Sequence, residues 1–221
     1  MSLVLASNSP RRKQLLGLGG WAFRVEPAQV DENPLPGEDA LAYVLRLAES
    51  KARFVAGRSP LDDIIIAADT TVVDEGQILG KPADAYEAES MLRRLRGREH
   101  QVFTALAVAR RSEGFLALDW CVTRVPMRTY SDEEMCAYIA TGDPLDKAGA
   151  YAIQHPGFSP VANLEGCYAN VMGLPLCHLK RTLMQLGIQT DSNIPQACQA
   201  DLQYSCSFLP QVLADYDRKL R

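Results

Sequence analysis

Apolar residues follow two different periods along the chain, and the two periods predict both strands and helices. Residues 64–68 form an uninterrupted apolar run, which is typical of a central strand covered on both faces, and it ends at Asp69. Residues 38–56 instead bring Val44, Ala48 and Val55 onto one helical face. Similar patterns predict further strands at residues 2–6, 101–110 and 115–130, a polar loop at 143–154 that passes into a strand, a strand near 167–171, and helices at 10–18, 85–96, 131–142 and 175–186.

Short polar signals mark where several of these elements begin and turn. Ser9 suits the N-cap of a helix that Pro10 opens, because its hydroxyl can accept from a free backbone N–H group. Ser131 and Glu134 have the spacing of a capping box. Residues 74–76 have the composition of a hairpin turn before a short strand at 77–79. Because strands and helices mix irregularly, we expect an α/β fold with a mixed, curved sheet flanked by helices.

The length of 221 residues favours one domain with an appendage. We expect a body at residues 1–189, because the predicted elements end there and residues 191–193 interrupt the pattern. Residues 190–221 are then a C-terminal extension, which we expect to form one or two short helices from residue 196 onward. No chemistry is assigned to this extension.

The composition excludes several classes of protein. Apolar residues make up 47% and charged residues 23% of the chain, unlike a disordered, collagen-like or coiled-coil protein. The net charge of −4, without a helix-turn-helix pattern, argues against a nucleic-acid partner. No apolar stretch is long enough for a membrane span, and residues 1–6 lack a basic signal-peptide start. We therefore expect a cytoplasmic protein without a membrane partner, and the sequence leaves a monomer or a homodimer open.

The cysteines and histidines show no spacing that suggests a disulfide framework or a zinc site. The six cysteines include no C-x-x-C pair, so we expect reduced thiols. Cys177 and His178 are neighbours in the sequence, but neighbouring residues on a helix point about 100° apart. This argues against a catalytic Cys–His pair.

Arg11 and Arg12 lie in the first turn of a predicted helix, whose positive end should repel them. An anion bound at that end would remove the conflict, since backbone N–H groups and two guanidinium groups could converge on a phosphate. Alternatively, both arginines point to solvent at a small cost in stability. This segment alone does not decide between the two.

Carboxylates occur at two further positions of interest. Asp69 and Thr70 follow the buried strand, and ligands of open α/β sheets gather where strands end. A carboxylate there could hold a divalent metal or accept a proton from water, or it could cap a turn. Glu32 lies beside Asp31 in a polar loop, where such pairs are usually solvated.

Three more polar residues could contribute to a binding site. Gly76, Gly80 and Lys81 resemble a P-loop but lack one intervening residue and the Ser or Thr that binds magnesium, so only a phosphate contact by Lys81 stays open. Lys51 lies at the border of its helix's apolar face, and it could reach solvent or a cleft. The amide of Gln154 could match the imide edge of uracil or thymine, or it could be exposed. Together with Arg12, these cations and carboxylates suit metal-assisted cleavage of a phosphoanhydride.

The ordered set of motifs resembles the Maf-like nucleotide pyrophosphatases over residues 3–188. The residues that carry the resemblance are Ser7-Asn8-Ser9-Pro10-Arg11-Arg12, Leu15-Leu16, Glu32, Ala48-Glu49-Ser50-Lys51-Ala52, Ala68-Asp69-Thr70, Gly80-Lys81-Pro82, Asp146-Lys147-Ala148-Gly149-Ala150-Tyr151 and Gly173-Leu174-Pro175. The resemblance implies an elongated α/β fold related to inosine-triphosphate pyrophosphatases. It also implies a cytoplasmic enzyme that converts nucleoside triphosphates to monophosphate and pyrophosphate with a divalent metal, Mg²⁺ or Mn²⁺, and that is linked to division arrest.

The resemblance also implies roles for individual residues. Asp69 would accept the proton from water, and Glu32 and Asp69 would hold the metal. Phosphate would be bound by Ser7, Arg12, Lys51 and Lys81. Arg11, Thr70 and Gln154 match the triplet of the subgroup that acts on dTTP and UTP.

Two departures and two alternatives accompany this interpretation. His155 follows Gln154 where the family usually has glycine, and the extension is longer than the family norm. One alternative function is a non-enzymatic sensor that binds a nucleoside triphosphate and signals to the division machinery. The other is a pyrophosphatase that prefers modified nucleotides.

Overall fold

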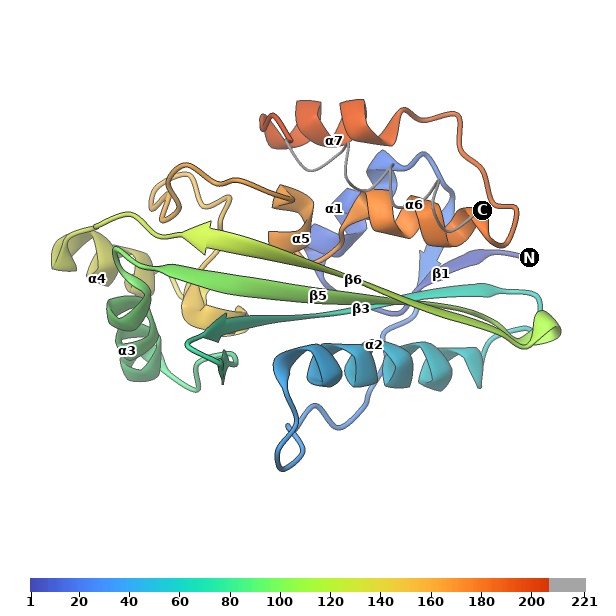
Figure 1. The fold of residues 1–221 in the computed structure, drawn as a ribbon, viewed down its shortest axis with the longest axis horizontal. Coiled ribbons are helices and arrows are strands. Elements are labelled where there is room, and N and C mark those ends of the chain that lie inside the picture. Colours follow the sequence, from blue (N-terminus) through green and yellow to red (C-terminus); the bar gives the residue numbers. More distant parts are fainter. Residues whose placement is uncertain (207–221) are drawn as a thin grey trace.

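The computed structural model describes residues 1–206, and within them the strands form one six-stranded sheet (Figure 1). The strand order is β2 (Phe23–Val25), β1 (Leu3–Leu5), β3 (Ile64–Asp74), β5 (Glu99–Arg110), β6 (Phe115–Pro126), and β4 (Gln77–Leu79) pairs with the end of β3. β1 runs parallel to β2 and β3, whereas β3, β5 and β6 are antiparallel. The predicted α/β class with a mixed sheet is therefore confirmed.

Three long strands give the molecule its elongated shape. β3, β5 and β6 have 11, 12 and 12 residues and run along its longest axis (Figure 1). The register between β3 and β5 is unbroken from Ile64 opposite Arg110 to Val73 opposite Gln101. These strands hold together segments that are far apart in the sequence.

Helix α2 (Ala40–Ala56) covers one face of the sheet (Figure 1). Its amphipathic pattern buries Val44 and Ala48 against Ile65, Ala67 and the alanines of β5. Successive residues of a strand point to opposite faces, so Ile64 and Ile66 of the same run pack in the core on the other side. The run 64–68 is apolar throughout because both faces of β3 are covered.

The opposite face is covered by helices α1 (Pro10–Leu18), α5 (Tyr168–Val171) and α6 (Leu176–Met184), which come from both ends of the described chain (Figure 1). Helix α7 (Ile194–Leu202) packs on the outer side of these three helices. Helices α3 (Ala85–Leu95) and α4 (Asp132–Ala140) lie together at one end of the long strands. The N-caps expected at Ser9 and Ser131 are present, and the capping box of Ser131 with Glu134 is complete.

β3 has a gap in its pairing along one edge. β1 pairs with Ile64–Ile66, and β4 pairs with Val72–Asp74 on the same edge, because β5 occupies the other. Residues 67–71 therefore have no strand partner on this side. The expectation that the strand ends at Asp69 is wrong: Asp69 lies in the middle of β3, because pairing with β5 carries the strand on to Asp74.

Two expected strands are helical turns in the structure. Residues 143–154 form the 3₁₀ turns Asp143–Asp146 and Ala148–Ala150, where Gly149 and Ala150 have positive φ angles of 70° and 61° that no strand allows. Residues near 167–171 form α5, since the side chain of Asn170 donates to Val102 O at 3.0 Å and to Thr123 Oγ1 at 2.9 Å. These contacts pack the segment across the sheet rather than beside it, and periodicity alone cannot assign so short an apolar run.

Two smaller differences concern one short strand and the end of another. β2 was not expected, and it forms because its backbone pairs with β1. β6 ends at Pro126 rather than at residue 130.

The described part of the C-terminal extension packs on the body. Ser192 Oγ donates to Leu18 O at 2.8 Å, and Gln14 Nε2 donates to Asp201 Oδ2 at 2.8 Å. α7 supplies the helix expected there, whereas the expectation for residues 207–221 lies outside the described residues. The division of the chain at residue 189 stays a prediction. Among residues 1–206 there is no helix with the length and apolarity that a membrane crossing requires.

Candidate active site

A cavity of about 940 Å³ opens at the gap along β3. Its walls come from the start of α1, the loop before α2, α2 itself, the middle of β3, and the segments at 146–154 and 171–173. All nine residues that the sequence singled out line it: Ser7, Arg11, Arg12, Glu32, Lys51, Asp69, Thr70, Lys81 and Gln154. The structure thus brings the candidate residues together, while the role of each stays a prediction.

Lys51 joins the two carboxylates of the cavity. Its Nζ lies 2.6 Å from Asp69 Oδ1 and 2.6 Å from Glu32 Oε1. The sequence left a solvent-exposed Lys51 open, but the residue is only 7% exposed because α2 lies flat on the sheet beside the gap. Of the two alternatives, solvent or a cleft, Lys51 therefore reaches into the cleft.

The two carboxylates have opposite electrostatic environments. Burial raises the pKa of Asp69, and the positive charges of Lys51 and Arg12 oppose this shift without cancelling it. For Glu32, partial burial raises the pKa, but the hydrogen bond and charge of Lys51 and the charges of Lys81 and Arg12 outweigh it, so the net shift is downward. A carboxylate with a raised pKa is a better proton acceptor, and one with a lowered pKa stays anionic.

The side chain of Arg12 is held by three hydrogen bonds. Nε donates to Gly173 O at 2.8 Å, Nη2 to Thr70 Oγ1 at 3.0 Å, and Nη1 to Ser7 Oγ at 3.4 Å. Gly173 has φ of 102°, and a Cβ atom there would lie 3.0 Å from Thr70 Oγ1 and 3.3 Å from Arg12 Nε. This close approach, together with the positive φ, explains why glycine occupies the position.

The remaining candidates lie at the rim. Lys81 and Gln154 are exposed, and Arg11 is half-buried. Within the described residues, no side-chain hydrogen bond or ion pair restrains these three, so they are available to a ligand. At the start of α1, Ser9 caps the backbone N–H of Arg12 at 3.4 Å.

Sequence reasoning missed Tyr43 and gave no role to Lys147 and Tyr151 of the motif at residues 146–151, and all three line the cavity. Tyr43, about two turns before Lys51 on α2, donates from its hydroxyl to Glu32 O at 2.9 Å. The side chain of Lys147 is buried and bound to Asp143 and Asp146, so it shapes the loop before Gln154. Tyr151 receives support from His100, whose Nε2 lies 2.7 Å from its hydroxyl. Tyr43's place on the face of α2 near Lys51 was the one available signal.

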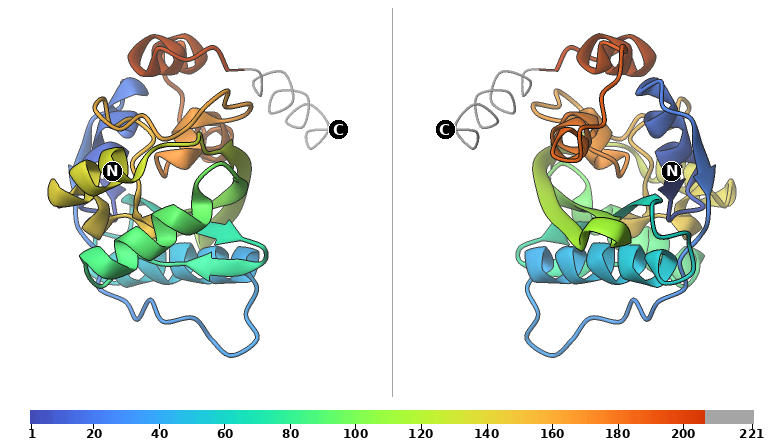
Figure 2. Two further views of the ribbon diagram at one scale, coloured as in Figure 1. Left: turned by 90° about the vertical axis from the view of Figure 1, so that its left-hand side faces the viewer. Right: turned by 90° about the vertical axis from the view of Figure 1, so that its right-hand side faces the viewer.

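Tyr43 and Arg46 tether the loop that carries Glu32. This loop projects beyond α2 (Figure 2). Arg46 Nη2 donates to Asn33 O at 3.1 Å, and its guanidinium also pairs with Glu38 at 2.6 and 2.7 Å. Glu32 therefore reaches Lys51 through a tethered loop, whereas Asp69 is fixed by a strand.

The residues present fit a divalent metal. Both carboxylates approach one cation, Lys51 Nζ, so the space between them is favourable for positive charge. Among residues 1–206 no group of three or more His, Cys, Asp or Glu side chains is arranged to hold a metal ion. Mg²⁺ is usually coordinated by one or two carboxylates together with water and phosphate oxygens of the ligand.

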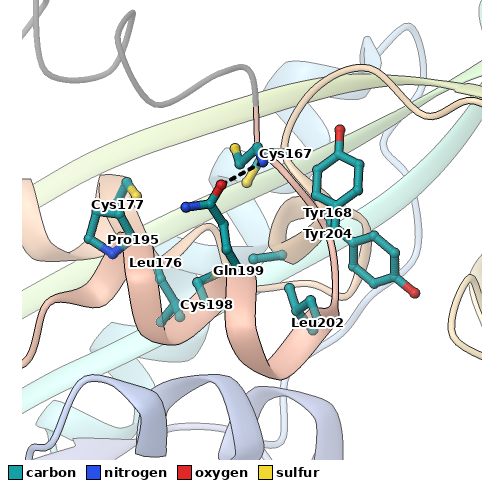
Figure 3. A pocket seen from close by; sticks show the side chains of 11 residues that line it. Cys167, Tyr168, Leu176, Cys177, Pro195, Cys198, Gln199, Leu202 and Tyr204 are labelled. Atoms are coloured by element: carbon teal, nitrogen blue, oxygen red, sulfur yellow. Dashed lines mark hydrogen bonds between the residues drawn. The ribbon is translucent and has the colours of Figure 1, made fainter.

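A second, much smaller cavity of about 30 Å³ lies between α7 and the body (Figure 3). Cys177 of α6, Cys198 of α7 and Cys167 border it together with Leu202 and Tyr204. None of the six cysteines, all of which lie within residues 1–206, forms a disulfide. The apolar lining makes this a gap in packing.

The open mixed sheet and a cavity that gathers cations around two carboxylates define an α/β protein with a site for an anionic ligand. The family model described as Maf-like protein matches residues 2–186. The chain therefore belongs to the Maf-like protein family.

Curated relatives agree with this assignment. A protein of Thermomicrobium roseum named dTTP/UTP pyrophosphatase is 48% identical over 205 residues, covering 90% of this chain and 92% of its own. A Myxococcus xanthus protein of the same name is 50% identical over 186 residues, covering 84% of this chain and 93% of its own. The solved Ham1 protein of Staphylococcus aureus is similar over 98% of this chain and 100% of its own, with a TM-score of 0.46 and 13% identity. The family assignment does not depend on this last likeness.

Proposed function

We propose that this chain hydrolyses nucleoside triphosphates, dTTP and UTP foremost, to the monophosphate and pyrophosphate. The observation that carries the proposal is the arrangement of Asp69, Lys51 and Glu32 at the gap in β3, where a proton acceptor lies among cations. Relatives that share 46–50% identity with this chain carry the name dTTP/UTP pyrophosphatase. The name supports both the reaction and the choice of nucleotides.

The cations of the cavity serve the triphosphate. Arg12 has five N–H groups, of which three are bound to the protein. The other two remain for phosphate oxygens. Lys51 and Lys81 add positive charge, which offsets the charge that develops on the leaving pyrophosphate.

Asp69 acts as the proton acceptor in this proposal. Water attacks the α-phosphorus, its proton passes to Asp69, and the bond from that phosphorus to the bridging oxygen breaks. Because burial raises the pKa of Asp69, the carboxylate retains more basicity than an exposed aspartate. Hydrolysis should fall at acidic pH, since a protonated Asp69 can neither accept another proton nor bind a cation well.

Glu32 and Asp69 would hold a divalent cation, Mg²⁺ or Mn²⁺, with water and phosphate oxygens. When bound, the cation neutralises phosphate charge and lowers the pKa of water. The lowered pKa of Glu32 keeps this carboxylate anionic and suited to a cation. Lys51, which pairs with both carboxylates, would share them with the cation and add its own positive charge beside the phosphates.

Gln154, Arg11 and Thr70 are assigned to nucleotide choice. The exposed amide of Gln154 can both donate and accept, which matches the alternating groups of a uracil or thymine imide. Cytosine presents a different order of donors and acceptors along that edge. Because a Gln154 amide that turns over matches that order too, the expected preference for dTTP and UTP over dCTP and CTP rests on the names of the relatives.

The test is a panel of nucleoside triphosphates, including modified pyrimidine nucleotides, assayed with Mg²⁺, with Mn²⁺ and without metal. Monophosphate and pyrophosphate should appear in equal amounts, fastest from dTTP or UTP, and only with a metal. Release of orthophosphate and diphosphate would contradict the assigned bond cleavage. Tight binding of nucleotide with no hydrolysis would instead support a sensor.

A further inference from the structure

A chain of hydrogen bonds leads from the partly buried Arg12 into the core of the sheet. Arg12 Nη2 lies 3.0 Å from Thr70 Oγ1, which lies 2.9 Å from Thr104 Oγ1 on the neighbouring strand β5. Thr104 Oγ1 lies in turn 2.9 Å from Asn170 O in α5. Thr104 and Asn170 are both fully buried, and neither lines the cavity.

The chemistry of these groups fixes the direction of every proton in the chain. Asn170 O is a carbonyl and can only accept, so the single hydroxyl proton of Thr104 points to it. Thr104 Oγ1 must then accept from Thr70, whose own proton is directed into the core. Thr70 Oγ1 is left with lone pairs alone toward the cavity, and it accepts from Arg12 Nη2.

This ordering holds the guanidinium of Arg12 in one orientation. A Thr70 hydroxyl free to rotate could turn its proton toward Arg12 and repel it. With the proton directed inward, Thr70 and Gly173 O offer two fixed acceptors to Nη2 and Nε. The two N–H groups of Arg12 that remain unbound are then held in place before a ligand arrives.

Asn170 is fixed independently of Arg12. Its side-chain amide donates to Val102 O and to Thr123 Oγ1, and Val102 O can only accept, so the amide has one orientation. Its backbone oxygen also accepts from Gly173 N at 2.9 Å. The carbonyl that orients Thr104 is thus anchored to β5 and β6, and it retains a partner if the hydroxyl of Thr104 is removed.

We propose that Thr104 is a positioning residue, which orients Thr70 and through it the guanidinium of Arg12 for a polyphosphate. The polyphosphate nature of the ligand rests on the proposed function. Preorganised donors bind more tightly because less freedom is lost on binding. Loss of the Thr104 hydroxyl should therefore weaken polyphosphate binding even though Thr104 touches no ligand.

The experiment compares Thr104→Val with Thr104→Ser in the full chain. Binding of inorganic tripolyphosphate is measured by calorimetry, and kcat and KM are measured for dTTP. Thr104→Val keeps the shape but removes the hydroxyl, and it should weaken tripolyphosphate binding about tenfold, the size expected for one hydrogen bond to a charged group. Thr104→Ser keeps the hydroxyl and should bind within about twofold of the parent protein.

Thr182→Val is the matched control. Thr182 is also buried and its hydroxyl also donates to a backbone carbonyl, His178 O at 3.0 Å, but it lies on α6, outside the cavity and outside this chain of hydrogen bonds. It should lower the urea midpoint as Thr104→Val does and leave tripolyphosphate binding within about twofold. Equal losses of binding in both variants, or none in Thr104→Val, would overturn the positioning role. If Thr104→Val does not fold, Thr104→Ala takes its place.

A double-mutant cycle with Arg12→Lys separates positioning from general stability. If Thr104 acts through the guanidinium, Thr104→Val should add less than about twofold in the Arg12→Lys background. Full additivity would contradict the proposal. If the parent protein binds tripolyphosphate but hydrolyses no nucleotide, the proposed function fails while the binding comparison still decides this inference. If it does not bind tripolyphosphate at all, the inference fails too.

Discussion

The small cavity under α7 and the large cavity at the gap in β3 surround their buried ionisable groups differently. The small cavity under α7 surrounds the thiols of Cys177 and Cys198 with apolar side chains, and burial raises the pKa of each to about 12. The large cavity also buries Asp69, and burial raises its pKa as well, but Lys51 and Arg12 act against the shift. Burial thus favours the neutral form in both places, and only the large cavity supplies counter-charges.

The comparison shows what makes one cavity a candidate site. A group that is buried without a counter-charge stays neutral and becomes part of the core. His100 behaves like the thiols: burial lowers its pKa to about 4, although it lies just behind the cavity wall formed by Tyr151. Of the two cavities, the one at the unpaired part of β3, where cations meet carboxylates, is therefore the candidate site.

The largest expected effect is that of Asp69→Asn. Removing the proton acceptor should lower kcat for dTTP by at least about 10²-fold, the usual contribution of a general base. Asp63→Asn is the control, because Asp63 is also buried beside a cation, Arg24 at 2.7 Å, but lies outside the cavity. The Asp63→Asn variant should be less stable, but its kcat should be unchanged. Near-normal turnover in Asp69→Asn would remove the main functional difference between the two cavities.

The next effect concerns acid stability through His100. Its pKa is about 4 in the folded protein, against about 6.5 in an unfolded chain, so the unfolded state binds more protons between these values. The stabilisation is complete above pH 6.5 and is lost as the pH falls toward 4. At pH 5 the loss of unfolding free energy caused by His100 should be about 2 kcal/mol.

Urea unfolding at pH 7 and pH 5 measures this loss, with His100→Gln for comparison. The glutamine can still bond to the hydroxyl of Tyr151 but does not titrate. The parent protein should lose more stability than the variant over this range. Equal losses of stability would show that His100 can be protonated in the folded protein, in contrast to the thiols, which stay neutral there.

Glu32→Gln should have a smaller effect, directed at the metal. The Mg²⁺ concentration for half-maximal hydrolysis should rise about tenfold, because one of two anionic ligands becomes neutral. Asp31→Asn tests the neighbouring carboxylate of the same loop, which bonds to Asn33 and does not line the cavity. Its metal requirement should be unchanged. An unchanged requirement in Glu32→Gln would leave Glu32 as an ion-pair partner of Lys51 only.

The smallest effect is expected in the small cavity. Cys198→Ser should leave kcat and KM unchanged, since this cavity contains no residue assigned to the reaction. In the folded protein, a thiol reagent at pH 8 should modify exposed Cys136 first and Cys177 and Cys198 slowly, because a raised pKa leaves little thiolate. Rapid modification of Cys198, measured by peptide mass spectrometry, would contradict the assignment of this cavity as inert packing.

Features that depend on near neighbours in the chain were predicted well. The helix over residues 10–18 matches α1 at both ends, and the caps at Ser9 and Ser131 are both present. The hairpin turn has positive φ at Glu75 and Gly76, as its composition indicated. Such features succeed because their hydrogen bonds close within a few residues.

Features that depend on distant segments were missed or left open. The segment near residue 167 forms α5 because Asn170 meets Val102 and Thr123, which lie on β5 and β6. Lys51 could have faced solvent or a cleft, and the choice was made by Asp69 and Glu32. Most candidate residues were singled out by their type and by their place beside a predicted element, and their roles came from the resemblance to a known family; no spacing revealed a shared cavity.

The sequence by itself determined the α/β class, most helix boundaries, and which residue types could serve phosphate and metal. Only the tertiary structure decided that β3 continues past Asp69 while β1 ends at Leu5, which opens the gap where those residues meet. It also decided which buried groups receive counter-charges and which way the proton of Thr70 points. The physical reason is that pairing of strands, burial and charge interactions are set by groups far apart in the chain, whose meeting no local pattern encodes.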